Sequence, residues 1–242
     1  KEQLADSLKE IGEVNLELNG QIAKPHSNDE LRIMNDESRQ EEKLQAPSYK
    51  LQELYSTREA YGDALVLLGQ TDPNLVVLDA ETSNSTYSEK FKSAYPNRFF
   101  EMYIAEQNMI SVALGMSKVG LHPFASTFAA FLSRGLDQIR MAQYSDADIK
   151  FCGSHAGISI GEDGPSQMGL EDISMMRSIL NSVVIQPSDA ISTIKLMKNF
   201  IKEKTIGYIR TIRPKTPVIY SDSEEFNIGE SKILHQSDKD KA

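Results

Sequence analysis

The sequence predicts an α/β domain with a mostly parallel central sheet flanked by helices. Four short apolar runs, three of them closed by polar residues, glycine or proline, predict strands buried on both faces. They are LVVLDA (75–80), IKFCG (149–153), SVVIQP (182–187) and IGYIRT (206–211). Helix-length stretches with apolar residues spaced near 3.6 lie between them, at 57–69, 105–118, 127–142 and 189–201. Strands that alternate with helices of this length build parallel sheets.

The first two predicted helices each have a recognisable signal. Ser56 and Glu59 stand at the spacing of a capping box, which predicts that the helix 57–69 begins beside Ser56. The helix 105–118 follows a predicted loop and has a broad apolar side for the core. That side is formed by Ile110, Val112, Ala113, Leu114 and Met116.

The other two helices depend on weaker signals. Phe124, Phe128 and Phe131 are four and three residues apart at the start of the stretch 127–142, a spacing typical of a core stripe. Ser188, directly after Pro187, is a reasonable N-cap for the helix 189–201. Ligands of parallel sheets meet the loops at the carboxyl ends of the strands, which directs attention to the loops after residues 79, 103, 152 and 210.

Both ends of the chain are polar. Leu4, Leu8 and Ile11 have helical spacing, so we expect a short amphipathic helix inside a polar connector at 1–50. The α/β domain is expected at 51–220. Residues 221–242 are interpreted as a polar tail or as the start of a further domain.

Composition excludes several classes of function. The chain has 242 residues, 40% hydrophobic and 25% charged, as in an ordinary globular protein. Its net charge of −9 and lack of a basic stripe argue against nucleic acid as a partner. No apolar run approaches the roughly 20 residues of a membrane span, and the charged N-terminus does not resemble a signal peptide. Cys152, the single cysteine, fits a reducing compartment. These features predict a cytoplasmic protein without a membrane partner.

The segment GSHAGISIGEDGPSQ (153–167) is the densest group of residues suited to chemistry. It contains four glycines, His155 and the adjacent carboxylates Glu162 and Asp163. Composition alone allows a long turn or a functional loop with about equal weight, and its length favours function. No His, Cys or carboxylate spacing here matches a metal-ligand set, and no Lys-Ser or Lys-Thr follows the glycines as in a phosphate loop.

Three further features have a structural and a functional interpretation. Glu106, in the first turn of the helix 105–118, either complements the helix dipole or is a buried acid that exchanges a proton with a bound ring. The phenylalanines 124, 128 and 131 fit a core stripe better than a stacking platform. The basic residues Arg58, Arg210, Arg213 and Lys215 are either solvated or bind phosphate, with Ser85 as a further donor or a helix cap.

Taken together, these segments resemble the middle, pyrimidine-binding domain of transketolase, most closely the animal type. The resemblance runs from about Ser56 to Pro214, with the motifs in the family's order and spacing. The main motifs are STREAYGDAL (56–65), LDAETSNSTYSEKF (78–91), RFFEMYIAEQNM (98–109), PFASTFAAF (123–131), DQIRMA (137–142), GSHAGISIGEDGPSQMGLED (153–172), MMRSI (175–179), QPSD (186–189) and IRTIRP (209–214). Parts also resemble the β component of 2-oxo acid dehydrogenases and deoxyxylulose-phosphate synthase.

The resemblance implies the thiamine-diphosphate-binding fold and transfer of a two-carbon ketol unit from a ketose phosphate to an aldose phosphate. Glu106 falls on the family's catalytic glutamate, whose protonated carboxyl hydrogen-bonds the cofactor's aminopyrimidine. Phe131, with Phe128 beside it, matches the aromatic wall on which that ring stacks. Glu81 and Thr82 match residues near the thiazolium.

The same resemblance implies residues for the sugar phosphate. Arg58, Ser85, His155 and Arg213 fall on positions that bind the phosphate end. Asp163 falls on the carboxylate that reads the acceptor's hydroxyl next to the carbonyl. Gln167 matches a position that lines the donor hydroxyls.

The family holds the diphosphate and its Mg or Ca ion with a separate N-terminal domain, whose GDG-type motif is not found here. The resemblance therefore implies half of an active site, which needs a diphosphate-binding domain from the same or a partner subunit and forms a homodimer when full length. The chain alone is expected to be inactive, and no metal ligands are assigned to it. Two alternatives stay open: the β subunit of a related thiamine-dependent dehydrogenase or synthase, and a non-catalytic dimerising module.

Overall fold

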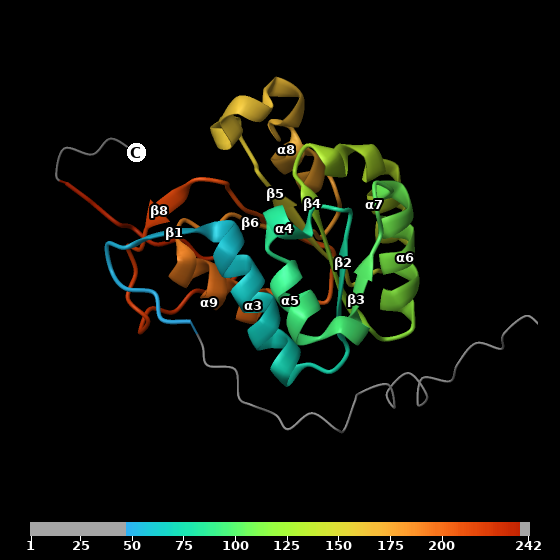
Figure 1. Ribbon diagram of the computed structural model, residues 1–242, viewed down its shortest axis with the longest axis horizontal. Coiled ribbons are helices and arrows are strands. Elements are labelled where there is room, and N and C mark those ends of the chain that lie inside the picture. The colour runs from blue at the N-terminus through green and yellow to red at the C-terminus, as the bar shows by residue number, and fades with distance from the viewer. Residues whose placement is uncertain (1–46, 238–242) are drawn as a thin grey trace, which may run out of the picture. The chain divides into compact units, whose positions relative to one another are not determined.

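The computed structural model describes residues 47–237, and the element labels follow Figure 1. Six parallel strands form the central sheet, in the order β3-β2-β4-β5-β7-β6. They are β2 (Leu75–Asp79), β3 (Phe99–Glu101), β4 (His122–Phe128), β5 (Lys150–Ser154), β6 (Val183–Ile185) and β7 (Gly207–Arg210). A separate antiparallel pair joins β1 (Leu54–Ser56) to β8 (Lys215–Pro217). The predicted α/β class with a parallel sheet is confirmed.

Helices cover both faces of this sheet. The α-helices are α3 (Thr57–Thr71), α4 (Ser83–Thr86), α5 (Glu89–Ala94), α6 (Glu106–Lys118), α7 (Leu136–Tyr144), α8 (Asp172–Arg177) and α9 (Ala190–Phe200). Short 3₁₀ segments are η1 (Pro96–Arg98), η2 (Phe131–Gly135), η3 (Ile158–Asp163) and η4 (Pro165–Gln167). Figure 1 shows α3, α5 and α9 on one side of the sheet and α6 and α7 on the other. The predicted helix around Leu4 to Ile11 lies outside the described residues.

The apolar strands supply two cores at once, because successive side chains of a strand point to opposite faces. Val76 and Leu78 of β2 pack with α6, α7 and α8, while Leu75 and Val77 pack with α3, α5 and α9. All five residues of β2 are buried. This two-sided burial explains why the strands appear in the sequence as continuous apolar runs rather than as alternating ones.

One predicted helix is partly wrong. The stretch 127–142 begins as the end of strand β4, continues through η2, and becomes α-helical only at Leu136. The apolar pattern does not predict β4 as a strand, because Pro123, Ser126 and Thr127 interrupt its apolar residues. The strand tolerates these residues because it lies between β2 and β5. Its backbone pairs on both sides, and the Ser126 hydroxyl lies 2.8 Å from the Tyr61 hydroxyl.

The predicted cap of α3 is confirmed and that of α9 is wrong. The Ser56 hydroxyl accepts a hydrogen bond from the Glu59 amide at 3.3 Å. At α9, Asp189 rather than Ser188 is the N-cap, and it forms a capping box with Ser192. The second carboxylate oxygen of Asp189 also accepts from the amides of Ile219 and Tyr220, so this residue joins α9 to the chain after β8.

Candidate active site

Parallel strands bring the ends of β2, β4, β5 and β7 to one edge of the sheet. The segments that follow these strands contain most of the residues that the sequence singles out. Helix α3 adds Arg58 from its first turn, and the Thr57 hydroxyl accepts a hydrogen bond from the Ile212 amide at 3.0 Å. That bond fixes the start of α3 to the segment after β7.

Three rings are stacked at this edge. The rings of Phe128 and Phe131 have centroids 5.0 Å apart and an interplanar angle of 12°. Phe128 also stacks on the imidazole of His155, with centroids 4.0 Å apart and an interplanar angle of 18°. Phe128 ends β4, Phe131 opens η2, and His155 follows β5, so the stack forms only when the two strands are paired. Of the three phenylalanines, Phe124 is a fully buried core residue, while Phe128 and Phe131 form this stack at the edge of the sheet.

His155 is held as a neutral imidazole. Its Nε2 lies 3.4 Å from Arg58 Nη1 and its Nδ1 lies 3.0 Å from the Ser154 hydroxyl. Burial, together with the charges of Arg58 and Arg213, lowers the pKa of His155 to about 4. An arginine can only donate, so Nε2 accepts and the proton of the neutral ring is on Nδ1, directed at Ser154.

Arg58 has a hydrogen-bond donor to spare. Its Nη1 donates to the Ser85 carbonyl at 2.9 Å, and its guanidinium lies 5.2 Å from the centroid of the Tyr87 ring. Its Nε is buried and has no hydrogen-bond partner among the described residues. Burial lowers the pKa of Arg58, and the nearby charge of Arg213 lowers it further. A half-buried cation that has an unused donor and lies near a second cation is suited to binding an anion.

Arg213 is already paired with the loop after β5. Its Nη1 donates to the Ile160 carbonyl at 2.7 Å and lies 3.3 Å from Asp163 Oδ2. Its Nη2 donates to Glu162 Oε1 at 2.9 Å. The guanidinium therefore connects the segment after β7 to η3.

A buried carboxylate shapes the segment after β2. Asp79 accepts hydrogen bonds from the amide and hydroxyl of Thr82 and from the hydroxyls of Thr86 and Ser88, at 2.6 to 3.0 Å. Burial raises the pKa of Asp79 to about 6, although each of these hydrogen bonds acts in the opposite direction. The same segment contains Ser85 and the exposed Glu81, so Asp79 sets the conformation on which their positions depend.

Glu106 opens α6 and is 3% exposed. Its Oε1 lies 3.4 Å from Arg134 Nη1, and Arg134 belongs to η2 together with Phe131. Helix α6 packs directly on η2: a side chain added at Gly135 would place its Cβ 2.1 Å from Ile110 Cδ1. The aromatic platform and the buried acid thus belong to two elements in contact.

The structure connects most, not all, of the residues chosen from the sequence. Direct contacts link Arg58 with Ser85 and His155, and Arg213 with Asp163. Phe128 and Phe131 join this group through the ring of His155. Glu106 meets Arg134 instead, and Glu81 and Thr82 lie in the segment organised by Asp79. Gln167, half-buried in η4, takes part in none of these contacts.

Two residues that shape this site, Asp79 and Arg134, are not predicted from the sequence. Asp79 closes the run LVVLD and is followed by Thr82, Thr86 and Ser88, a clustering of hydroxyls that could have been noticed. Arg134 gave no signal, because its contact with Glu106 depends on the packing of η2 on α6.

Arg210 is not available to bind phosphate. It was grouped with the phosphate-binding candidates, but its Nε pairs with the buried Asp172 at 2.7 Å. Its remaining nitrogens donate to the Gln186 side chain and the Gly169 carbonyl. The guanidinium is committed to these partners, which fix the far end of the 153–167 loop.

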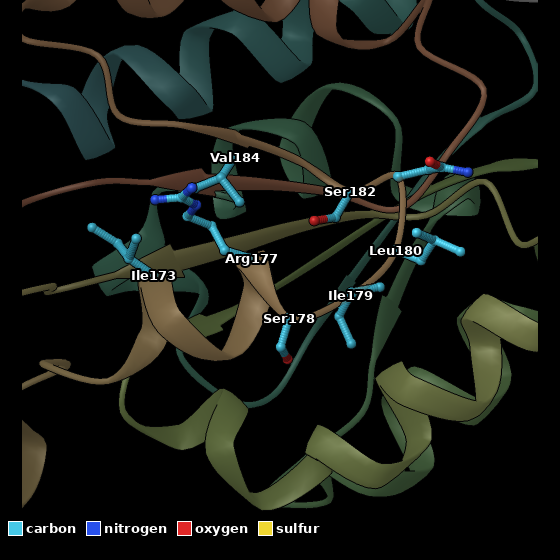
Figure 2. Close-up of a pocket in the computed structure, with 8 residues that line it drawn as sticks. Ile173, Arg177, Ser178, Ile179, Leu180, Ser182 and Val184 are labelled. Atoms are coloured by element: carbon cyan, nitrogen blue, oxygen red, sulfur yellow. The ribbon is translucent and has the colours of Figure 1, made fainter.

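A cleft of about 660 Å³ lies elsewhere, between α8 and the edge strand β6 (Figure 2). Figure 2 shows Ile173 and Arg177 on α8, with Leu180 and Val184 across the opening. Arg177 is the one charged side chain in its lining. The cleft lacks the clustered aromatic, acidic and basic groups of the sheet edge, which is therefore the candidate site.

Residues 47–237 contain neither a group of metal ligands nor a membrane-spanning helix. In this part of the chain, no three His, Cys, Asp or Glu side chains are placed to hold a metal ion together. Nor does any helix within it have the length and apolar character needed to cross a membrane.

Comparison with known sequences gives a consistent result. The family described as "Transketolase, pyrimidine binding domain" matches residues 53–218. The chain is 48% identical over 239 residues to transketolase-like protein 2 of Mus musculus, covering 98% of this chain and 38% of that protein. It is 50% identical over 195 residues to transketolase of Homo sapiens, covering 80% and 31%. The chain thus spans about a third of the length of these curated relatives.

Solved structures agree on the fold. A structure described as "Split gene transketolase, inactive beta4 tetramer" is 42% identical, with a TM-score of 0.67 over 75% of this chain and 59% of that one. Transketolase from Campylobacter jejuni is 21% identical, with a TM-score of 0.68 over 81% and 31%, and supports the fold alone.

Proposed function

Because the chain belongs to the transketolase family, we propose that it supplies half of an active site for ketol transfer. The reaction moves a two-carbon ketol unit from a ketose phosphate to an aldose phosphate. The chain contributes the pyrimidine-binding side. The other half comes from a diphosphate-binding domain of another segment or chain, in a homodimer when full length.

One observation carries this proposal: a stacked aromatic pair and the cationic Arg58 both contact the ring of His155. Phe131 and Phe128 lie on one side of that ring, and Arg58 lies at its Nε2. A coenzyme ring on the phenylalanines would thus have a binding site for a phosphorylated substrate next to it. Such adjacency is what a reaction between a bound heterocycle and a sugar phosphate requires.

The residues present fit the pyrimidine ring of thiamine diphosphate, which the family implies as cofactor. When bound, this cofactor supplies the electron sink for carbon–carbon bond cleavage. Phe128 and Phe131 would stack on the planar ring, and the buried Glu106 carboxyl would form a hydrogen bond with a ring nitrogen. Glu81 and Thr82 lie in the segment that would face the thiazolium. The diphosphate and its Mg or Ca ion would be held mainly by the other domain.

The cationic end of the site fits a sugar phosphate. Arg58 and Arg213, with Ser85 and a neutral His155, would bind the phosphate, since the unpaired Nε of Arg58 needs an acceptor. Asp163 would accept a hydrogen bond from the acceptor's hydroxyl next to the carbonyl. Gln167 would line the hydroxyls of the donor.

Complementation tests the proposal. The chain is mixed with the diphosphate-binding domain of a transketolase relative, thiamine diphosphate and Mg²⁺, and ketol transfer is assayed. We expect transfer only in the mixture, and the split-gene relative is described as an inactive beta4 tetramer. Glu106→Gln should lower turnover by about 10²-fold or more without loss of folding. Glu89→Gln, which changes an exposed acid of α5, is the matched control.

Two outcomes would replace the proposal. If both pieces are folded and associate but no transfer occurs, the chain is a non-catalytic dimerising module. If the mixture acts on 2-oxo acids and not on sugar phosphates, the chain is a β subunit of a thiamine-dependent dehydrogenase.

A further inference from the structure

Arg213 holds a loop that has few other contacts at its tip. The loop is η3, and among its residues only Ile160 is buried. Gly161 and Gly164 have φ angles of +79° and +84°, and no atom lies within 4 Å of the Cβ that either residue lacks. Glycines in this conformation, in open space, allow the backbone to change direction without a steric cost. The described contacts that hold the tip are the three accepted from Arg213, by Ile160, Glu162 and Asp163.

The base of the same loop is fixed independently of Arg213. The Gly157 amide donates to the Gly169 carbonyl at 2.9 Å, and Arg210 Nη2 donates to the same carbonyl at 3.0 Å. Arg210 is in turn paired with the buried Asp172. Release of Arg213 would therefore free the exposed residues 161–163 at the tip and leave the base of the loop and the buried Ile160 in place.

Glu162 is the weakest of the three partners of Arg213. Its side chain is 77% exposed, against 35% for Asp163, and ion pairs in such exposed positions contribute little. Its own backbone amide and then Arg213 lower its pKa, so it is a carboxylate at neutral pH. Glu162 thus occupies Nη2 of Arg213 with an anionic group that water solvates well.

The surroundings favour exchange of this carboxylate for a stronger anion. The charge of Arg213 acts on Arg58, and both charges act on the neutral His155, whose Nε2 lies 3.4 Å from Arg58 Nη1. The Nε of Arg58 lacks an acceptor. A phosphate dianion could satisfy both guanidinium groups, whereas the carboxylate of Glu162 is bonded to one.

We propose that Glu162 is an intramolecular competitor for phosphate at Arg213, and that binding of a sugar phosphate releases the tip of the 158–163 loop. Glu162 is then a positioning residue. It holds Nη2 of Arg213 and the loop while the site is empty. A phosphate that takes both Nη atoms displaces it together with Asp163, which is then free to contact the substrate. This inference rests on the proposed function, in which Arg213 binds the phosphate of the substrate.

The test uses the 242-residue chain and inorganic phosphate as the probe. Phosphate is titrated while the arginine Nε–H signals and the amides of residues 158–164 are followed by NMR. Glu162→Gln should bind phosphate about two- to fivefold more tightly, the gain expected from removal of an exposed ion pair. Its loop amides should exchange faster without phosphate, as those of the wild type should when phosphate is added. Glu89→Gln makes the same change of charge elsewhere and should bind phosphate as the wild type does.

Arg213→Gln separates this inference from the proposed function. If Arg213→Gln weakens phosphate binding while Glu162→Gln leaves it unchanged or weaker, the competition is overturned and the phosphate site stands. If Arg213→Gln leaves the affinity unchanged, phosphate does not bind at Arg213, and both the competition and that part of the proposed function are overturned. A structural role for Glu162 alone would not increase the affinity for phosphate.

Discussion

The imidazole of His155 lies face to face with the ring of Phe128, with centroids 4.0 Å apart and planes inclined by 18°. Phe128 belongs to β4 and His155 follows β5, which is the neighbouring strand. The stack joins the aromatic part of the candidate site to its cationic part. Five predictions follow from this site and from the strands and loops that build it.

Phe128 should matter more to stability than Phe131. Phe128→Leu removes two ring stacks and leaves a void at the position of Phe128, which is only 8% exposed. We expect a loss of about 1–3 kcal/mol in the free energy of unfolding. Phe131→Leu removes one stack from a half-buried position and should cost less. Urea denaturation of both variants is the measurement, and an equal or larger loss for Phe131→Leu would contradict the geometry.

His155 should stay uncharged well below neutral pH. Its folded pKa of about 4 lies below the unfolded value of 6.5, so the unfolded chain binds more protons between these values. The contribution of His155 to stability is therefore complete above about pH 6.5 and is lost as the pH falls toward 4. NMR titration of the imidazole checks the value, and Arg58→Met should raise it by removing a neighbouring cation. A wild-type imidazole that titrates near 6.5 would refute this.

Asp79 should have the opposite pH dependence. Its pKa is raised from 3.8 to about 6, so the folded chain binds more protons in that interval, and its contribution to stability falls as the pH rises through it. Because His155 contributes the opposite slope in both proteins, the net slope of stability against pH between pH 4 and 6 should be more positive in Asp79→Asn than in the wild type. Asp137→Asn, at an exposed ion pair of α7, is the control and should keep the slope. If Asp79→Asn keeps the slope as well, its cause lies elsewhere.

Asp79→Ala should be more damaging than Asp79→Asn, because it leaves the buried hydroxyls of Thr86 and Ser88 without their acceptor. We expect a loss of about 2–4 kcal/mol at pH 7. Equal stabilities of the two variants would show that the hydroxyls find other partners.

Gly153 should not tolerate a side chain. A Cβ at this position in β5 would lie 2.1 Å from the Tyr208 hydroxyl oxygen and 2.7 Å from two carbons of its ring. Tyr208 cannot move away freely, since it is fully buried and donates to Asp172 at 2.6 Å. Gly153→Ala should therefore lower the free energy of unfolding by about 2–4 kcal/mol.

Gly115 provides the matched control for Gly153. It lies inside α6, and no atom is within 4 Å of the Cβ that it lacks. Gly115→Ala should stabilise the chain by up to about 1 kcal/mol through helix propensity. Destabilisation of both variants by the same amount would mean that the contact with Tyr208 is not the cause.

The sequence predicted the elements whose signals are local. The runs that became β2, β5, β6 and β7 are apolar because both faces of each strand are covered, and that requirement is written in consecutive residues. Strand β4 was missed and part of it was placed in a helix. Its Pro123, Ser126 and Thr127 are tolerated only through pairing with two neighbours and a hydroxyl contact with Tyr61.

For the candidate site, the motifs named the residues but not their partners. Arg58, His155 and Arg213 were chosen from the sequence, yet the effect of the two arginines on the pKa of His155 depends on how α3 lies against the segments after β5 and β7. Arg210 has the same chemical type as Arg213 and is the last residue of β7, the strand that Arg213 follows, but the buried Asp172 beside it gives it a structural partner. Residue type alone could not separate the two.

By itself, the sequence determined the α/β class, the family and the edge of the sheet at which the chemistry would gather, because apolar periodicity and motif order are properties of neighbouring residues. Tertiary structure alone decided the contact of Glu106 with Arg134, the ring stack of His155 and the hold of Arg213 on Glu162. These pairs are 28, 27 and 51 residues apart in the chain. Only strand pairing and helix packing bring such distant side chains within reach, and no local pattern records that.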